Sequence, residues 1–371
     1  MQKEPDIVLT PSEPHLIIVM NRLLFLDALR GIAALSVALF HYTSVYRSLY
    51  GHSFSPAFDF DYGLFGVELF FMISGFVIFF SFDRIKSGSE FLFNRGIRLY
   101  PTYWFSMITT FVVVQTFSLP GLETTFTDML VNLTMFQKLA RVPDVDGVYW
   151  SLFSEWMFYL MMLGLFMTNN LKRILWVGPI WVLLSLVHKY GVSFGPVGAI
   201  LNLYHGVFFY AGILFYLLMK QPEKRNIVLA HLLFCIAVIV ALYLPEGLPH
   251  TLVVISFFGV FYLGLIGKME FLVNKVLLFL GSISYALYLI HQFVGYVIIN
   301  ETKHLFGDSL LVIVPPLAIT LTAAWLITAY IEKPVVSRLK TWYKQRSGHT
   351  LPQEKKIPVS GFAKPETAPT K

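Results

Sequence analysis

The chain is poor in charge and almost free of cysteine. Charged residues make up 13% of its 371 residues, whereas hydrophobic residues make up 56%. Because a soluble globular domain carries about a quarter charged residues, this composition excludes an ordinary soluble protein. The single cysteine, Cys235, excludes an intramolecular disulfide, and its position in an apolar run argues against a nucleophilic thiol.

Several motifs that would define a common enzyme class are also missing. No metal-ligand spacing, phosphate-binding loop, dinucleotide-binding glycine pattern or nucleophile elbow occurs in a suitable context. The net charge of +6 is not gathered in one basic patch, so nucleic-acid binding has no support. The first nineteen residues are acidic and contain prolines, unlike a secretory signal peptide. The start of translation is open between Met1 and Met20.

Long apolar runs recur along the chain instead. Most of them approach the ~20 residues that a helix needs to cross a bilayer. Their continuous rather than alternating apolar character favours helices over a β-barrel. We therefore predict an all-α polytopic integral membrane protein with about ten transmembrane helices. The predicted spans are 24–46, 62–82, 99–118, 148–168, 174–188, 198–219, 227–244, 251–267, 277–299 and 309–331.

The basic residues orient these predicted helices. Lysine and arginine gather in every second loop, and the opposite loops hold only Arg47, Lys138, Arg141, Lys189 and Lys303. Since cytoplasmic loops carry the excess of positive charge, both termini are predicted to be cytoplasmic. The chain divides into a cytoplasmic extension at 1–21, a membrane domain at 22–342 and a polar, basic tail at 343–371, which is predicted to be disordered.

Three ionisable residues interrupt the first apolar run, "LDALRGIAALSVALFH" at 26–41. Arg30 and His41 are separated by about three helical turns, so their side chains point the same way, about 16 Å apart along the axis. Asp27 lies one turn from Arg30, within reach of an ion pair. Each residue alone is compatible with a structural role. Because intramembrane ionisable groups are costly and usually mark a site or pathway, three on one stripe favour a site.

An arginine pair occurs in "FLFNRGIRLYPTYW", where a cytoplasmic loop meets the third predicted helix. Arg95 and Arg98 can be simple anchors on the positively charged side. Alternatively, two guanidinium groups one turn apart can bind phosphate oxygens bidentately. Pro101 suits an early helical position, which would place both arginines at or just before the start of that helix.

Two acidic residues lie within predicted spans. Glu155, in "GVYWSLFSEWMFYL", is inside the fourth span, with Trp150 and Ser151 toward its outer end. Glu68 is inside the second span. Either carboxylate can be a structural hydrogen-bond partner, and a tryptophan at an outer boundary is ordinarily part of an interfacial aromatic belt.

The last two predicted spans carry the remaining candidates. Ser284, Tyr288 and His291 in "LGSISYALYLIHQF" share one helix face. A satisfied core histidine is the simpler interpretation of His291. In "AYIEKPV", Glu332 is predicted to end the tenth helix and Pro334 to stop it.

Together, in this order, these motifs resemble the acyltransferase family 3 membrane proteins, which are bacterial O-acyltransferases of surface polysaccharides. The resemblance runs from residue 22 to about 335 and covers Arg30 with His41, "GVELFFMISGF", "RGIRLYPTYW", "WSLFSE", "GSISYALYLIHQF" and "IEKP". One departure is "HQF", where many relatives have a proline shortly after the histidine. The SGNH-type domain that some relatives carry is not found.

The resemblance implies transfer of an acyl group, usually acetyl, from cytoplasmic acyl-CoA to a sugar hydroxyl. The acceptor would be an O-antigen, an exopolysaccharide or a lipid-linked glycan, and the location the bacterial inner membrane. No permanently bound cofactor or metal is expected. Arg30, Arg95 and Arg98 would hold the phosphates of coenzyme A, and His41 would act as general base.

The other candidates receive less defined roles. Glu155 would orient the acceptor or the imidazole. The acceptor path would be lined by Trp150, Ser151, Tyr288 and His291. The roles of Asp27, Glu68, Ser284 and Glu332 are structural or open.

Two rival classes remain at this point. In a proton-coupled transporter or a glycan or lipid flippase, His41, Glu68 and Glu155 would form a proton relay without covalent chemistry. A non-catalytic partner in a polysaccharide export complex would need none of these residues. The arginines on the cytoplasmic rim favour the enzyme, because a proton relay does not require them.

Overall fold

Helices account for all regular secondary structure in residues 14–347, the part of the chain that the computed structural model describes. The α-helices are α1 (Pro14–Phe40), α2 (Tyr46–Tyr50), α3 (Gly66–Ser81), α4 (Gly88–Phe117), α5 (Phe126–Asn132), α6 (Trp150–Met167), α7 (Ile174–Tyr190), α8 (Pro196–Ile200), α9 (Gly206–Lys220), α10 (Arg225–Tyr243), α11 (Leu248–Leu265), α12 (Lys275–Ile290), α13 (Gln292–Thr302), α14 (Val314–Ile327) and α15 (Lys333–Ser347).

Short turns of tighter or wider helix join these elements. Two are π-helical, η1 (His41–Val45) and η11 (Thr328–Glu332). The others are 3₁₀-helical: η2 (Pro56–Phe58), η3 (Asp61–Phe65), η4 (Gly147–Tyr149), η5 (Leu171–Arg173), η6 (Pro222–Lys224), η7 (Leu244–Glu246), η8 (Glu270–Leu272), η9 (Lys303–Leu305) and η10 (Leu310–Ile313).

Seven of the described helical stretches are long and apolar enough to cross a membrane. An eighth candidate joins α12 and α13, which meet at a bend of 75°. The chain is therefore an all-helical, multi-pass membrane protein, as predicted. The predicted spans 99–118 and 198–219 correspond to part of α4 and to the short helices α8 and α9. The total of about ten spans and the cytoplasmic side of both termini stay predictions.

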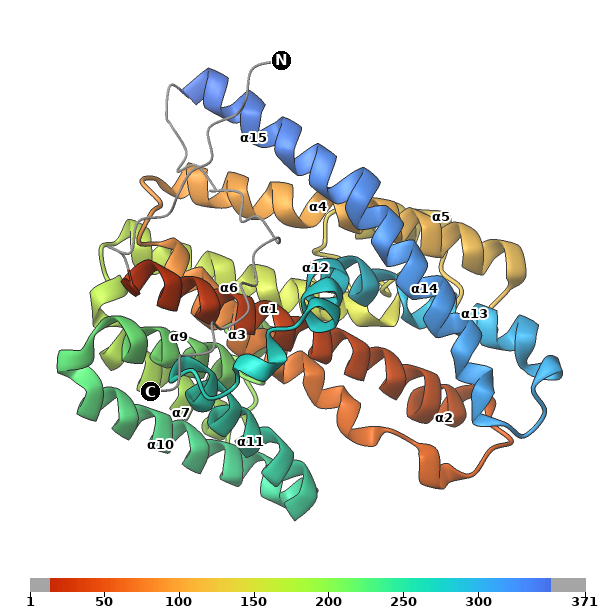
Figure 1. Ribbon diagram of the computed structural model, residues 1–371, viewed down its shortest axis with the longest axis horizontal. Coiled ribbons are helices and arrows are strands. Elements are labelled where there is room, and N and C mark those ends of the chain that lie inside the picture. The colour runs from red at the N-terminus through yellow and green to blue at the C-terminus, as the bar shows by residue number, and fades with distance from the viewer. Residues whose placement is uncertain (1–13, 348–371) are drawn as a thin grey trace, which may run out of the picture.

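Helix α1 runs through the middle of the molecule, with α4 and α15 on one side and α10 and α11 on the other (Figure 1). Among the described elements, α1 packs most extensively against α12, and α3 against α9. Both contacts depend on glycine. A Cβ added to Gly281 of α12 would lie 2.1 Å from the carbonyl oxygen of Asp27, and one added to Gly212 of α9 would lie 2.0 Å from that of Met72. Small residues let membrane helices approach this closely.

The start of α4 corrects one prediction. The helix begins at Gly88, not near residue 99, because the Ser87 side chain accepts a hydrogen bond from the Glu90 backbone N–H at 3.2 Å. Such a cap satisfies one of the unpaired N–H groups at a helix start. Arg95 and Arg98 therefore lie within a continuous helix, and Pro101 is an interior residue.

Two predicted spans are interrupted. The segment 198–219 breaks between α8 and α9, where Asn202 adopts a left-handed backbone (φ 52°) and donates to the Ser154 carbonyl oxygen at 2.6 Å. The segment 277–299 bends at His291. There the backbone N–H of Phe293 donates to Asp146 at 3.1 Å, outside its own helix. The prediction of a single straight helix is therefore wrong for both segments.

The C-terminal part of the membrane domain also differs from the prediction. Pro334 does not stop the tenth helix, because the π-turn η11 passes directly into α15 and shifts the hydrogen-bond register just ahead of the proline. Helix α15 extends to Ser347, past the predicted start of the tail at 343. Helix α1 begins at Pro14, inside the predicted extension 1–21. The rest of both segments lies outside the described residues, and so does Met1, one of the two possible starts of translation.

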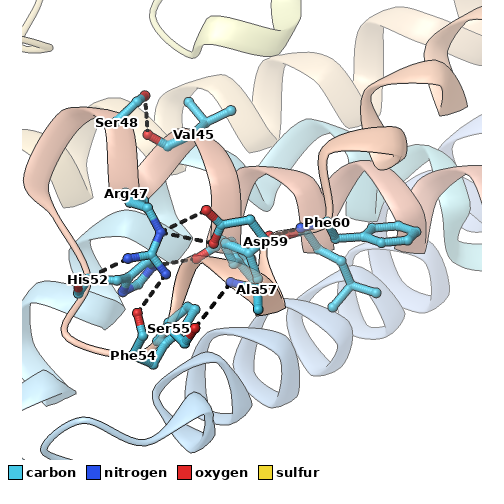
Figure 2. A network of polar contacts seen from close by, with 12 residues as sticks. Val45, Arg47, Ser48, His52, Phe54, Ser55, Ala57, Asp59 and Phe60 are labelled. Carbon is cyan, nitrogen blue, oxygen red and sulfur yellow. Dashed lines mark hydrogen bonds and ion pairs between the residues drawn. The ribbon is translucent and has the colours of Figure 1, made fainter. Parts of the chain in front are cut away.

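Arg47 holds the segment that follows the first candidate span through several polar contacts (Figure 2). The Nε of Arg47 lies 2.9 and 2.7 Å from the two carboxylate oxygens of Asp59, and its terminal nitrogens donate to the carbonyl oxygens of His52 and Phe54. The exposed fractions of the Arg47 and Asp59 side chains are 19% and 13%. This network fixes residues 51–60 against the end of the first span.

Replacement of Gly281 by alanine tests the contact between α1 and α12. The added Cβ overlaps the backbone of α1, so we expect Gly281→Ala to lower the free energy of unfolding by about 1–3 kcal/mol, a typical cost of overpacking. The apparent melting temperature of the detergent-solubilised protein measures the effect. Gly259→Ala in α11 is the matched control, because nothing lies within 4 Å of its added Cβ. Equal melting temperatures for the two variants would contradict the close contact.

Candidate active site

A cavity lies among α1, α3, α4, α6 and α12 and encloses about 750 Å³, including its open mouth. Polar and aromatic side chains line part of it: Arg30, Ser74, Arg95, Arg98, Ser151, Glu155, Tyr159, Ser284, Tyr285 and Tyr288. The rest of the wall is apolar: Val67, Phe70, Phe71, Ile73, Val77, Ile78, Leu99 and Leu152. The structure therefore brings the three predicted arginines together with Glu155, Ser151, Ser284 and Tyr288 around one space.

The arginines of this cavity have few direct partners. Arg30 reaches Asp27 with one nitrogen at 3.9 Å, as the spacing predicts. Arg98 forms no hydrogen bond or ion pair with any residue of the described range. Glu332, on η11, lies within electrostatic reach of both Arg98 and Arg30. The nearby carboxylates thus offset the partly buried positive charge, while most guanidinium N–H donors stay available to a ligand.

Arg95 is held by aromatic rings instead. Its guanidinium lies 5.6 Å from the ring centre of Phe91 and 5.8 Å from that of Tyr159, and its buried Nε has no hydrogen-bond partner within the described residues. Tyr159 donates its hydroxyl hydrogen to Glu155, which also accepts from Ser74 at 3.3 Å. Glu155 therefore faces the arginines, and none of its hydrogen bonds goes to an imidazole. Free donors of this kind suit an oxyanion such as phosphate.

The two predicted histidines contact each other outside this cavity. His41 opens the π-turn η1, a helix irregularity that is frequent at functional sites. Its Nδ1 lies 2.9 Å from the Val37 carbonyl oxygen and 3.0 Å from Nε2 of His291. The Nδ1 of His291 lies 3.1 and 2.9 Å from the carbonyl oxygens of Leu287 and Tyr288. Thus the shared direction of Arg30 and His41 does not make His41 part of the cavity wall.

One aromatic residue, Tyr288, contacts both the cavity and the histidine pair. Tyr288 lines the cavity, and its ring centre lies 5.8 Å from that of His291 and 5.6 Å from that of Phe70. Its hydroxyl group lies 2.7 Å from Oγ of Ser151. Tyr288 and Ser151, predicted on different helices, therefore form one wall.

Two other predicted residues lie away from this space. Trp150 packs against His205 and Phe71, with ring centres 5.2 and 6.2 Å away, and does not line the cavity. Glu68 is buried and accepts from the Tyr243 hydroxyl at 3.2 Å, while its second oxygen has no hydrogen-bond partner in the part of the chain that the structure describes.

The sequence interpretation missed Asp146, a buried carboxyl group just before the span that begins at Gly147. It accepts hydrogen bonds from the N–H groups of Phe293 and Val148 at 3.1 and 3.3 Å, and so caps the starts of two helical segments. Burial raises the pKa of Asp146 to about 7, although both N–H groups favour its ionised form. An aspartate directly before a glycine and an apolar run was the available signal. The second hydrogen-bond partner of Asp146, Phe293, is distant in sequence, so the sequence held no signal for that contact.

No group of three or more histidine, cysteine, aspartate and glutamate side chains within residues 14–347 is arranged to hold a metal ion. The polar part of the cavity wall consists of arginine, carboxylate, hydroxyl and aromatic groups. Groups of these kinds, together with the adjacent histidine pair, are chemically suited to bind an oxyanion and to transfer a proton.

Comparison with known proteins identifies the class. A family model described as an acyltransferase domain matches residues 23–329. A protein named acetyltransferase ORF330, from Acidianus two-tailed virus, is 26% identical over 277 residues, which is 71% of this chain and 80% of the viral protein. The exopolysaccharide production protein ExoZ of Rhizobium meliloti is 32% identical over 119 residues, 30% of this chain and 37% of that protein. No solved structure matches the chain.

The chain belongs to acyltransferase family 3, which confirms the resemblance seen in its motifs. It is a membrane-bound O-acyltransferase. The matched range contains every candidate site residue described above except Glu332, which lies three positions beyond its end.

Proposed function

We propose that the protein transfers an acyl group, most simply acetyl, from cytoplasmic acyl-CoA to a hydroxyl of a carbohydrate. The observation that carries the proposal is the cavity in which Arg98 has no hydrogen-bond or ion-pair partner among the described residues, and Arg30 and Arg95 have few. Phosphates, like carboxylates, match the fork geometry of such guanidinium groups and bind them bidentately. The apolar stretch of the same wall suits the thin pantetheine arm of coenzyme A.

His41 is the proposed general base. Its Nε2 takes the proton of the acceptor hydroxyl while the oxygen attacks the thioester carbonyl carbon. The carbon–sulfur bond then breaks, the thiolate of coenzyme A leaves, and His41 returns the proton to that sulfur. General base catalysis of this kind contributes about 10²–10⁴-fold to the rate. The Tyr288 ring lines the cavity and contacts His291, and in this proposal it moves aside so that the thioester can meet His41.

Glu155 has a different proposed role from the one that its sequence position suggested. Its contacts with Ser74 and Tyr159 support a function in holding the arginine side of the cavity. By attracting Arg98 and Arg95 without pairing with them, the carboxylate would keep their donors directed toward the phosphates. It is a positioning residue in this proposal and does not orient the imidazole.

The acceptor is proposed to be an exopolysaccharide, an O-antigen or a lipid-linked glycan in the bacterial inner membrane. One relative, ExoZ, is named for exopolysaccharide production. Ser151, Tyr288 and the more distant Trp150 lie toward the predicted outer side and are the proposed acceptor contacts.

The transporter alternative is less well supported. A relay through His41, Glu68 and Glu155 requires hydrogen-bonded neighbours. Instead Glu68 bonds to Tyr243, Glu155 to Ser74 and Tyr159, and no hydrogen bond joins the three proposed relay groups in the described part of the chain.

Purified protein with radiolabelled acetyl-CoA and candidate glycans tests the function. We expect His41→Ala to lose about 10²–10⁴-fold in transfer rate, the contribution of a general base, while the protein still accumulates in the membrane. His304→Ala is the control, since His304 is an exposed histidine outside the site. Full activity of His41→Ala would remove the base assignment, and wild-type protein without transfer to any glycan would remove the function.

A titration with coenzyme A tests the donor site separately from the chemistry. A charge-assisted hydrogen bond contributes about 1.5–3 kcal/mol, so Arg98→Ala should weaken binding roughly 10- to 100-fold. Arg225→Ala, an exposed arginine at the start of α10, should bind like the wild type. An unchanged dissociation constant for Arg98→Ala would contradict the phosphate assignment.

A further inference from the structure

We infer that His291 is a positioning residue that fixes the proton of His41 on Nδ1 and leaves Nε2 of His41 as a free base. The inference rests on the proposed function, because a base is needed only if an acyl group is transferred to a hydroxyl. It changes the role of His291 from acceptor binding, as its sequence position suggested, to control of the catalytic imidazole.

The proton on His291 is located by its backbone partners. A neutral imidazole has one N–H donor and one lone-pair acceptor. The Nδ1 of His291 lies 3.1 Å from the Leu287 carbonyl oxygen and 2.9 Å from that of Tyr288, and carbonyl oxygens only accept. Nδ1 therefore carries the hydrogen, and Nε2 of His291 is the acceptor.

The tautomer of His41 follows from the same argument. Its Nδ1 faces two acceptors, Nε2 of His291 at 3.0 Å and the Val37 carbonyl oxygen at 2.9 Å. Nδ1 must therefore carry the hydrogen of His41. The lone pair is then on Nε2, which has no hydrogen-bond partner in the described part of the chain.

The position of His291 is itself fixed by the break between α12 and α13. Its carbonyl oxygen accepts from the Tyr42 hydroxyl at 2.8 Å, on the residue next to His41. The next helix begins at Gln292, and Asp146 binds the N–H of Phe293. The imidazole ring of His291 is fully buried. His291 thus lies at the C-terminal end of α12, where its ring meets His41 of the helix that packs against α12.

This arrangement differs from a carboxylate–histidine pair in charge. In serine hydrolases a buried aspartate selects the histidine tautomer and stabilises the imidazolium, and its loss of charge costs about 10⁴-fold in rate. Here a neutral imidazole selects the tautomer. When His41 takes the hydroxyl proton on Nε2, its Nδ1–H still donates to His291, so no buried anion is needed in the apolar bundle.

Two substitutions of His291 separate positioning from packing. His291→Gln places an amide oxygen near the former Nε2, where it can accept from His41. His291→Asn ends at the former Nδ1, where its amide can serve the backbone carbonyls but cannot reach His41. We expect His291→Gln to stay within tenfold of the wild-type kcat and His291→Asn to lose about 10²–10³-fold, less than the loss of an aspartate from a triad.

Purified full-length protein, labelled acetyl-CoA and an accepted glycan provide the readout. KM for acetyl-CoA should change less than twofold in both variants, because His291 does not line the cavity. Equal kcat values for the Asn and Gln variants, with both proteins folded, would overturn the inference. The proposed function would survive that result, since only a lack of transfer by the wild type removes it.

Chemical rescue covers the case in which the glutamine variant does not fold. His291→Ala leaves space for an added small ring beside His41. Imidazole, which has a lone pair to accept from Nδ1–H, should restore kcat at least tenfold, whereas pyrrole, which has an N–H but no such lone pair, should not. Rescue by both rings or by neither would overturn the inference.

Discussion

The close approach of α1 and α12 is the contact on which the candidate site depends. Gly31 and Gly281 allow it, since a Cβ on either would lie within 2.6 Å of the other helix's backbone. At this separation the polar residues of α1 face those of α12. Arg30 then shares a cavity with Ser284 and Tyr288, and His41 reaches His291. The site is therefore largely a consequence of helix packing, to which the loop residue Asp146 adds the hydrogen bond at the bend between α12 and α13.

Electrostatics divides this site into two regions. The arginine region contains charged groups whose mutual attraction makes burial tolerable, while hydrogen-bond donors remain free for an anion. The histidine region contains only neutral partners, two imidazoles and backbone carbonyl oxygens. Under the proposed function, a phosphate-bearing donor and a proton acceptor would operate within one apolar bundle, with Tyr288 in contact with both regions.

Much of this was predictable from the sequence, for physical reasons. Continuous apolar runs predict membrane helices, and the spacing of Asp27 and Arg30 predicts their ion pair, because both follow from local periodicity. The signal for the start of α4 at Gly88 is also local, because it is the capping residue Ser87. The charged residues nearby interrupt the apolar run and hide this helix start in the sequence. The bend at His291 was not predictable, since it depends on Asp146, which is more than a hundred residues away. The same holds for the contact of His41 with His291, which needs the packing of α1 on α12.

The position of the donor tests the account most directly. A structure of the protein with a non-reactive acyl-CoA analogue, determined in a lipid nanodisc, would locate both ends of the molecule. The account predicts phosphates in contact with Arg95 and Arg98, and the thioester mimic beside Nε2 of His41 with Tyr288 displaced. An analogue bound elsewhere, or with its acyl group far from His41, would contradict it.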